Sequence, residues 1–307
     1  MANIKELARK SELLTGGHRL CAGCGAPIVI RQVLSAVKNP IVISNATGCV
    51  EVSTTIYPYT AWNCSWIHVA FENAAAVISG VETMYRSLKK QGKVADDYRF
   101  IAIGGDGGTY DIGMQALSGM LERGHKCLYV CYNNEAYMNT GIQRSSATPR
   151  GADTTTNPVG KAATIGKTQE KKDLTAICAA HGVPYVAQAS PAYWNDLITK
   201  ADKALNCGGA SFMNIIAPCH RGWRYNPEDT VYMARLAVQT CVWPLYEVEN
   251  GKYRITYRPK EKIPVSEWFK SQGRFRHLFK PENSGFIEEI QKKIDAGWER
   301  LEKLETL

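Results

Sequence analysis

The feature that most constrains the fold of this chain is a regular alternation of apolar strand segments with helical segments. Strands are expected at 41–44, 100–103, 127–132, 184–188 and 211–216, and helices at about 72–90, 112–122, 171–181 and 191–206. This alternation predicts an α/β fold with a mostly parallel central sheet and helices on both faces. With 307 residues, of which 45% are hydrophobic, the chain is long enough to bury a sizeable core.

The composition narrows the location and the classes of partner. No apolar run approaches the ~18 residues of a membrane span, and the polar N-terminus lacks the apolar core of a secretory signal. We therefore expect a cytoplasmic protein without membrane contact. The net charge of +8 fits either a solvated basic surface or docking of acidic proteins such as a ferredoxin. The basic residues are scattered and form no nucleic-acid motif, so nucleic-acid binding is not expected.

Distinctive polar or glycine-rich clusters follow four of the predicted strands. They are NATGC at 45–49, GDG at 105–107, NN at 133–134 and PCH at 218–220. In sheets of this kind, ligands bind at the carboxyl ends of the strands. We therefore expect these four clusters to meet at one edge of the sheet and to form a single site.

The GDG and NN clusters, with 25 residues between them, predict a site for a diphosphate and its metal ion. Mg²⁺ binds oxygen ligands in near-octahedral geometry. Asp106 offers a carboxylate, Asn134 a side-chain carbonyl and Ala136 a backbone carbonyl. A lone GDG is more often only a tight turn between strand and helix, but the asparagine pair after the next strand favours the binding site.

Ten cysteines are many for a cytoplasmic chain, where disulfides are disfavoured. Cys21 and Cys24 form a CxxC motif, whereas Cys49 and Cys219 each follow a predicted strand. Spacing alone admits a structural zinc site or an iron–sulfur cluster, because both accept four thiolates. The other six are expected to be buried and inert, with Cys64 the least certain because it lies in a loop-like segment.

We divide the chain at residue 240. Residues 1–240 hold the predicted sheet and its site. Their last helix is expected to have Asn226 as its N-cap and Pro227 at its first position, and to run to about Thr240. Residues 241–307 are a C-terminal extension with a β-hairpin, whose turn is Asn250-Gly251, and an amphipathic helix at about 285–304. We expect the extension to cover the core domain or a neighbouring subunit.

Several long motifs resemble the pyruvate:ferredoxin oxidoreductases, in the order that this family shows. They are NATGC, YPYTAW, SWIHVAFENAAAV, NNEAYMNTGIQRSSATPRG, LAVQTCVWPLYEVENG and QGRFRHL. The GDG and NN spacing resembles the thiamine-diphosphate motif. The likeness runs from about His18 to Leu278, which is most of the chain, and it implies a thiamine-diphosphate-binding fold.

The resemblance also implies roles for particular residues. Cys21, Cys24, Cys49 and Cys219 resemble the thiolate ligands of one 4Fe–4S cluster, and Asn139 resembles a residue near the substrate, although an asparagine in a turn explains it equally well. Many relatives carry glutamate after the CxxCG, where this chain has Ala26. The residues implied to contact thiamine diphosphate are Thr47, Gly48, Cys49, Gly105, Asp106, Gly107, Gly108, Asn134, Glu135, Ala136, Tyr137, Met138 and Asn139.

The implied function is that of the β subunit of a 2-oxoacid:ferredoxin oxidoreductase of anaerobic metabolism. Pyruvate, coenzyme A and oxidised ferredoxin would give acetyl-CoA, carbon dioxide and reduced ferredoxin, reversibly. The family implies a pyrimidine-binding α subunit, a γ subunit and a ferredoxin-like δ subunit as partners. Two alternatives stay open, namely a relative acting on 2-oxoisovalerate or oxalate, and a non-catalytic scaffold stabilised by zinc.

Overall fold

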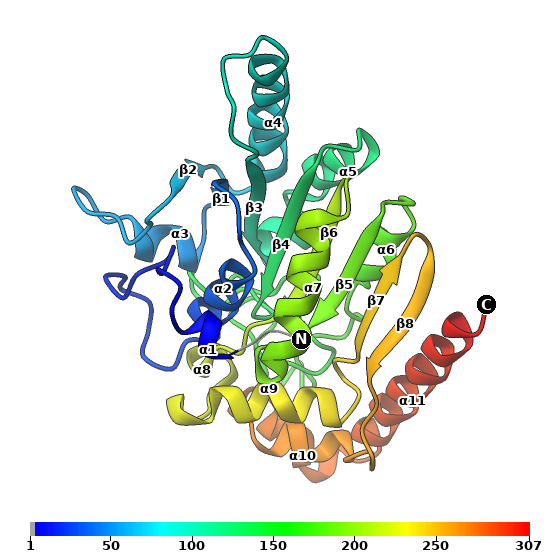
Figure 1. The fold of residues 1–307 in the computed structure, drawn as a ribbon. Coiled ribbons are helices and arrows are strands. Elements are labelled where there is room, and N and C mark those ends of the chain that lie inside the picture. Colours follow the sequence, from blue (N-terminus) through cyan, green and yellow to red (C-terminus); the bar gives the residue numbers. More distant parts are fainter. Residues whose placement is uncertain (1–3) are drawn as a thin grey trace.

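The computed structural model describes residues 4–307, and in this part of the chain an eight-stranded sheet runs through the molecule (Figure 1). The strand order is β2-β1-β3-β4-β6-β5-β7-β8. The first six strands along the chain pair in parallel, and the last two are antiparallel. The strands are β1 (Ile41–Ala46), β2 (Ser65–Val69), β3 (Arg99–Gly105), β4 (Cys127–Asn133), β5 (Tyr185–Ala189), β6 (Ser211–Ile216), β7 (Leu245–Glu249) and β8 (Lys252–Tyr257).

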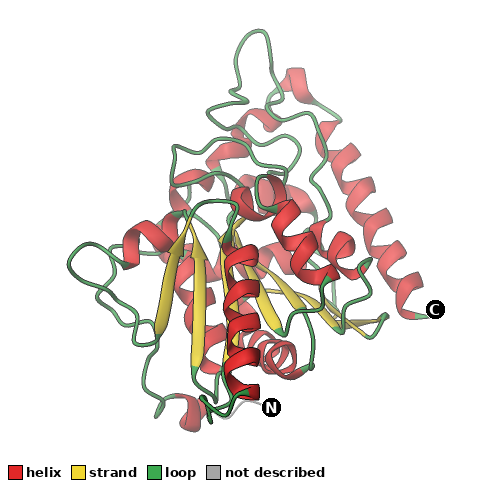
Figure 2. Ribbon diagram, turned by 90° about the horizontal axis from the view of Figure 1, so that it is seen from above, coloured by secondary structure: helices red, strands yellow, loops and turns green. Residues whose placement is uncertain are grey.

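Helices cover both faces of the sheet, as the alternating pattern predicts (Figure 2). One hydrophobic core packs α2 (Gly25–Ser35) and α7 (Trp194–Asn206) against one face. On the other face, a second core joins the sheet to four helices, of which α11 contributes Trp298 and Leu301. These helices are α4 (Ala74–Lys90), α5 (Met114–Glu122), α6 (Leu174–Ala179) and α11 (Phe286–Glu305).

A third hydrophobic core lies beyond the carboxyl end of β6 and is rich in aromatic side chains. It contains Trp223, Trp243, Trp268 and Phe275. The surrounding elements are α8 (His220–Trp223), η3 (Pro227–Asp229), α9 (Thr230–Gln239), α10 (Val265–Lys270), η4 (Gly273–Phe279) and η5 (Pro281–Asn283). Parts of the C-terminal segment are therefore built into the region next to the strand ends.

Four features depart from the sequence-based predictions or add to them. Strand β2 was not predicted, and neither was α2, which begins directly after the CxxC motif. Pro227 starts a 3₁₀ turn as its fixed φ favours, but the exposed Asn226 side chain makes no capping hydrogen bond. The predicted hairpin is present, with φ of 50° at Asn250 and 81° at Gly251, and its strand β7 pairs with β5, so it extends the main sheet.

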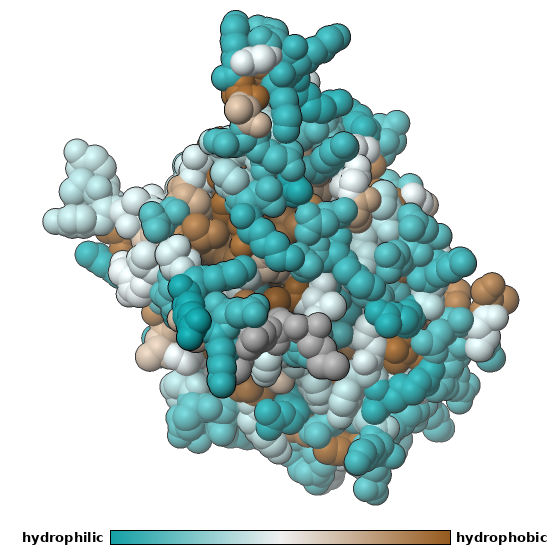
Figure 3. All heavy atoms as spheres, in the orientation of Figure 1, coloured by the Kyte–Doolittle hydropathy of each residue, from teal (hydrophilic) through white to brown (hydrophobic). Residues whose placement is uncertain are grey.

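The remaining elements are short. They are α1 (Ile4–Leu7), α3 (Cys49–Thr54), the π-helical turn η1 (Gly107–Asp111) and η2 (Pro191–Tyr193). From residue 134 to residue 173 the chain forms a long loop without a helix or a named strand, as predicted for 144–170. The face in Figure 3 is mostly hydrophilic, and within residues 4–307 we find no helix with the length and apolarity that a bilayer span requires.

Candidate cofactor-binding site

The ends of β1, β3 and β4 meet in one pocket, as predicted from the clusters that follow these strands. Most of the residues implied by the resemblance line it, together with Phe71, Tyr132 and Thr140, which sequence reasoning missed. Asp106 and Glu135 are fully buried behind it. The predicted residues in the lining are Thr47, Gly48, Cys49, Gly105, Gly107, Gly108, Asn134, Ala136, Tyr137, Met138 and Asn139.

Two glycines in this lining are required by close packing. A Cβ atom on Gly107 would lie 2.4 Å from the ring of Tyr137, and one on Gly48 would lie 2.6 Å from the Tyr132 hydroxyl. Real Cβ atoms do not come this close to other heavy atoms. Glycine therefore lets the backbone after β1 and β3 pass directly beneath two tyrosines, and a ligand in the pocket can approach bare backbone.

Three oxygens converge at the floor of the pocket. The Asn134 side-chain oxygen lies 2.9 Å from Asp106 Oδ1 and 2.9 Å from the Ala136 carbonyl oxygen, and it faces only acceptors. Two arrangements would remove this repulsion between neighbouring oxygens. Turning the amide over would place a donating nitrogen between the two oxygens, whereas a cation among them would bind all three as they stand.

Asp106 is held in a setting that disfavours its charge. Burial, followed by the nearby Glu135, raises the pKa of its carboxyl to about 7, while hydrogen bonds from Ser145 and from the Asn134 backbone act in the opposite direction. The Ser145 hydroxyl donates to Oδ2 at 2.5 Å, and the Asn134 N–H donates to Oδ1 at 3.2 Å. A buried carboxylate of this kind gains most from a cation, because the cation offsets the cost of removing the charge from water.

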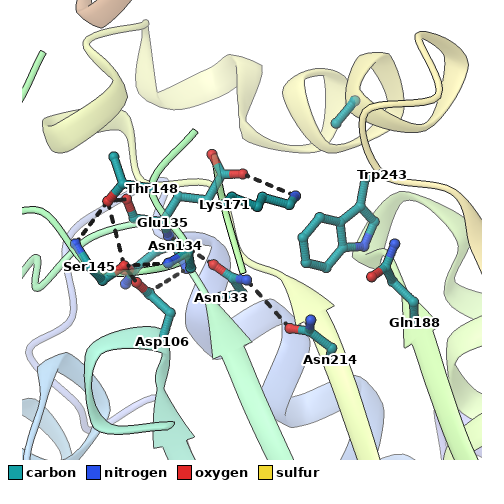
Figure 4. A network of polar contacts seen from close by, with 12 residues as sticks. Asp106, Asn133, Asn134, Glu135, Ser145, Thr148, Lys171, Gln188, Asn214 and Trp243 are labelled. Carbon is teal, nitrogen blue, oxygen red and sulfur yellow. Dashed lines mark hydrogen bonds and ion pairs between the residues drawn. The ribbon is translucent and has the colours of Figure 1, made fainter. Parts of the chain in front are cut away.

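A network of hydrogen bonds holds the segment from Asn133 to Ala136 around these oxygens (Figure 4). The Thr148 hydroxyl donates to the Glu135 carbonyl at 2.7 Å, and Trp223 Nε1 donates to the Asn134 carbonyl at 2.8 Å. The Glu135 N–H donates to Asn133 Oδ1 at 3.0 Å. The segment is thus fixed by the long loop and by α8, the helix that follows Cys219.

The four cysteines singled out in the sequence come together beside this pocket. Three of them lie at helix starts, because Cys24 precedes α2, Cys49 opens α3 and Cys219 precedes α8. Each pair among Cys21, Cys24, Cys49 and Cys219 is close enough to interact electrostatically. Burial, and then the neighbouring thiols, raise the pKa of Cys49 to about 12. A cationic centre would be needed to hold these groups as thiolates.

The CxxC loop is fastened to the strand end that carries Cys219. Gly25 N–H donates to the Pro218 carbonyl at 3.1 Å, and a Cβ on Gly25 would lie 2.7 Å from that oxygen. The Thr230 hydroxyl also donates to the Gly23 carbonyl. The described cysteines form no disulfide, and the described part of the chain has no group of three or more His, Cys, Asp or Glu placed to hold a metal ion.

The other predicted residues lie as follows. Asn139 is exposed at the pocket rim. Thr47 uses its hydroxyl to donate to the Val69 carbonyl at 3.2 Å. Ala26 is buried in the first core, and its N–H donates to the Cys24 thiol, which lowers the pKa of that thiol against the larger effect of burial. Cys64 packs against the same core, and burial raises its pKa to about 11.

Four residues that hold the site were missed, although each belongs to a motif quoted above or follows one of its cysteines. Ser145 and Thr148 lie in NNEAYMNTGIQRSSATPRG, Arg274 lies in QGRFRHL and Trp223 follows Cys219. Only their place in these motifs, or shortly after Cys219, could have drawn attention to them. Nothing in their own residue type or spacing indicates a contact with Asp106 or Glu135.

Comparison with known proteins gives the family. A family model described as "Thiamine pyrophosphate enzyme, C-terminal TPP binding domain" matches residues 46–215. The chain is 55% identical to pyruvate synthase subunit PorB of Thermotoga maritima, over 99% of this chain and 97% of the relative. It is 54% identical to PorB of Methanocaldococcus jannaschii, over 93% and 95%. Ketoisovalerate oxidoreductase subunit VorB of Pyrococcus abyssi is 47% identical, over 94% and 92%.

A solved structure agrees in fold. The 2-oxoglutarate:ferredoxin oxidoreductase from Magnetococcus marinus superposes with a TM-score of 0.55 and 19% identity, over 71% of this chain and 76% of that one. The parallel sheet, the pocket at its strand ends and the near-full-length relatives agree with one another. This chain therefore belongs to the PorB subunits of the thiamine-diphosphate-dependent 2-oxoacid:ferredoxin oxidoreductases.

Proposed function

We propose that this chain is the subunit of a pyruvate synthase that binds the diphosphate of thiamine diphosphate through Mg²⁺ and carries one 4Fe–4S cluster. The complex would convert pyruvate, coenzyme A and oxidised ferredoxin into acetyl-CoA, carbon dioxide and reduced ferredoxin, reversibly. The observation that carries the proposal is the convergence of the Asp106, Asn134 and Ala136 oxygens beneath a glycine-lined pocket.

The spacing of these oxygens fits magnesium. Octahedral Mg²⁺ holds each oxygen at about 2.0–2.1 Å, so adjacent ligand oxygens lie about 2.9 Å apart. The Asn134 side-chain oxygen is 2.9 Å from both of its neighbours. We assign these three oxygens to the protein's share of the coordination and leave the remaining positions to the diphosphate and water.

The four thiols fit an iron–sulfur cluster in number, and they lie near enough to one another to interact electrostatically. Four cysteine thiolates complete the coordination of a 4Fe–4S cluster. The start of α2 behind Cys24 adds a partial positive charge that favours thiolate. When bound, the thiamine ring supplies an electron sink for decarboxylation and the cluster supplies a one-electron acceptor. What supports the cooperation of the ring and the cluster is that Cys49 lines the pocket and also lies within electrostatic range of the other three thiols.

The chain's own side chains would orient the ligand and exclude water. Phe71 and Tyr137 form one wall of the pocket, with ring centroids 5.8 Å apart. Asn139 stands at the exposed rim, where its amide can hydrogen-bond a substrate oxygen. We retain the division into residues 1–240, which bind both cofactors, and the C-terminal extension 241–307.

The proposed partners follow from what the pocket leaves uncovered. A pyrimidine-binding α subunit would close the rim, a ferredoxin-like δ subunit would take electrons from the cluster, and a γ subunit would complete the assembly. The net charge of +8 favours the approach of acidic ferredoxin. The surfaces that we assign to the α subunit are the stretch 55–71 and the C-terminal extension.

A second substrate class is favoured by one comparison. The VorB relative is 47% identical to this chain, and the PorB relative from Pyrococcus furiosus is also 47% identical. Ferredoxin reduction by the purified native complex, assayed with pyruvate, 2-oxoisovalerate, 2-oxoglutarate and oxalate, decides between them. Higher kcat/KM for a branched acid than for pyruvate would replace the pyruvate assignment.

The proposal is tested by the variant Asp106→Ala. Loss of the carboxylate should abolish magnesium-dependent binding of thiamine diphosphate and leave the iron content intact, because the thiols do not depend on Asp106. Calorimetric titration of the cofactor into the assembled complex measures this. Asp97→Ala, which removes an exposed carboxylate paired with Arg99, is the control and should bind normally. Unchanged affinity in Asp106→Ala would overturn the metal assignment.

The zinc-scaffold alternative is tested by colour and metal analysis. A 4Fe–4S protein is brown, with broad visible absorption and four iron atoms per chain. A colourless protein with one zinc atom per chain would replace the cluster with a structural zinc site.

A further inference from the structure

The segment that presents two of the three oxygens is held in an unusual backbone conformation. Glu135 has φ of 64°, in the left-handed region that residues other than glycine rarely adopt. This residue lies between Asn134 and Ala136, and its turn leaves the Asn134 side-chain oxygen 2.9 Å from both Asp106 Oδ1 and the Ala136 carbonyl oxygen. Whatever holds Glu135 in this conformation therefore sets the geometry of the oxygens.

The side chain of Glu135 is anchored by a buried charge pair. Glu135 is fully buried, and Arg274 Nη2 lies 2.6 Å from its Oε2, while the Arg274 side chain is only 2% exposed. Lys171 Nζ is 4.0 Å from Oε1, and that oxygen accepts no hydrogen bond from the described residues (Figure 4). Arg274 is thus the main partner that compensates the buried carboxylate.

Arg274 also contacts the side chain that holds Asn134. Its guanidinium carbon lies 4.2 Å from the ring centroid of Trp223, and Trp223 Nε1 donates to the Asn134 carbonyl at 2.8 Å. The guanidinium is further enclosed by Trp268 and Phe275. One arginine, 139 residues away along the chain, therefore restrains both Asn134 and Glu135.

We propose that Arg274 is a positioning residue for the divalent-cation site. Through the Glu135 carboxylate and the Trp223 ring it holds the Asn134 and Ala136 oxygens at the separation that the cation requires. Arg274 lies outside residues 46–215, which match the thiamine-diphosphate domain, so the C-terminal segment completes the cation site of that domain. This inference rests on the proposed function, because it presumes that the three oxygens bind Mg²⁺.

The test is the variant Arg274→Met, in which an apolar chain of similar length fills the space among the aromatic rings. Thiamine diphosphate is titrated calorimetrically into the assembled complex at a series of Mg²⁺ concentrations. The concentration that gives half-maximal binding should rise about 10–100-fold, as for other residues that support metal ligands. The iron content should not change.

Two further variants separate positioning from general stability. In Arg274→Met with Glu135→Gln, both ends of the same link are removed, so the Mg²⁺ requirement should be raised to about the level of Arg274→Met alone and no further. A return to the wild-type value would mean that the single variant suffers only from an unpaired buried carboxylate. Arg254→Met breaks a pair with the buried Glu247 of β7, where Arg254 Nε lies 2.8 Å from Oε1. This control should keep its Mg²⁺ requirement within about twofold of wild type.

The outcomes are distinguishable from those of the proposed function. If Asp106→Ala binds thiamine diphosphate normally, the metal assignment itself fails. If Asp106→Ala loses binding but Arg274→Met keeps the wild-type Mg²⁺ requirement, or if the double variant returns to the wild-type requirement, only the role of Arg274 is overturned. Should Arg274→Met not assemble, Glu135→Gln alone decides, and a wild-type Mg²⁺ requirement in that variant overturns the proposal.

Discussion

Buried charged side chains gather behind the cofactor pocket, and each is matched to a partner. Asp106 is bound by Ser145, and Lys167 Nζ donates to the Thr148 carbonyl at 2.5 Å. The Thr148 hydroxyl in turn donates to the Glu135 carbonyl. Lys167 therefore supports the same segment from the side of the long loop, and it does so as a buried cation whose charge is costly.

The free energy of unfolding should depend on pH in a way that reflects the titration of Lys167. Burial, and then the nearby Arg144, lower its pKa from 10.5 to about 8. Between these values the unfolded chain holds a proton that the folded chain does not, so this residue's contribution to stability improves as the pH rises. Below pH 8 both states are protonated, and the cost of burying the charge is constant.

The check is urea unfolding of the wild-type chain and Lys167→Met at several pH values from 7 to 10.5. The free energy of unfolding of the wild type should increase relative to that of the variant between pH 8 and 10.5. Lys292→Met, on an exposed part of α11, is the control and should show no such trend. A constant difference for Lys167→Met across the range contradicts the prediction.

Some residues of the site could be predicted from sequence motifs, whereas others could be identified only from the folded structure. Asp106, Asn134 and Ala136 were predicted to meet because strand ends of a parallel sheet share one edge, and the structure brings them together. Arg274 was not assigned, because its contact with Glu135 depends on how the chain returns after 139 residues. Local patterns carry no information about such a distant pairing.

At the scale of elements, the buried strands were predictable and the edge strand β2 was not. Strands β3, β4 and β6 are nearly or wholly buried and read as apolar runs. Strand β2 pairs only with β1, and of its five residues only Val69 is buried, so its sequence SWIHV lacks the apolar signal. In the sheet β6 lies between β4 and β5, out of chain order. This order depends on long-range topology, and no local sequence pattern predicts it.

Gly107, the first residue of η1, is packed too closely for any larger side chain. A methyl group on Gly107 would collide with the Tyr137 ring and push it across the pocket. Gly107→Ala should therefore weaken thiamine diphosphate binding, and it should destabilise the folded chain by about 1–3 kcal/mol, the usual cost of overpacking.

The same substitution in an open position provides the control. Gly80 lies inside α4, and a Cβ there would have no atom within 4 Å. Gly80→Ala should leave cofactor affinity unchanged and should stabilise the helix by about 0.5–1 kcal/mol. Calorimetry measures affinity and thermal unfolding measures stability, and equal affinities for the two alanine variants would contradict the role assigned to Gly107.

At the scale of the whole molecule, the cofactor pocket opens toward exposed residues. Asn139 and Thr140 stand at its rim. Cys49, the first residue of α3, and Phe71, just after β2, both line the pocket. The connection between α3 and β2, residues 55–64, carries Tyr57 and Tyr59 at 94% and 76% exposure. Large aromatic side chains this exposed are typical anchors of a protein interface.

The isolated chain should therefore be inactive toward 2-oxoacids, even with cluster and thiamine diphosphate supplied. Activation of the aminopyrimidine needs a carboxylate within about 2.6–3.2 Å, which we assign to the α subunit. Adding that subunit should restore release of labelled carbon dioxide before any ferredoxin-like subunit is present. Substantial turnover by the chain alone would show that the activating carboxylate lies within it.

The four cysteines are divided between the matched domain and the segments on either side of it. Residues 46–215 match a domain shared with other thiamine enzymes, and this stretch contains Asp106, Asn134 and Cys49. The three remaining thiols, at 21, 24 and 219, lie outside it, in a leading loop fastened to the end of β6 and just past that end. A piece of the chain limited to residues 46–215 would therefore keep the oxygens of Asp106 and Asn134 but only one of the four thiols.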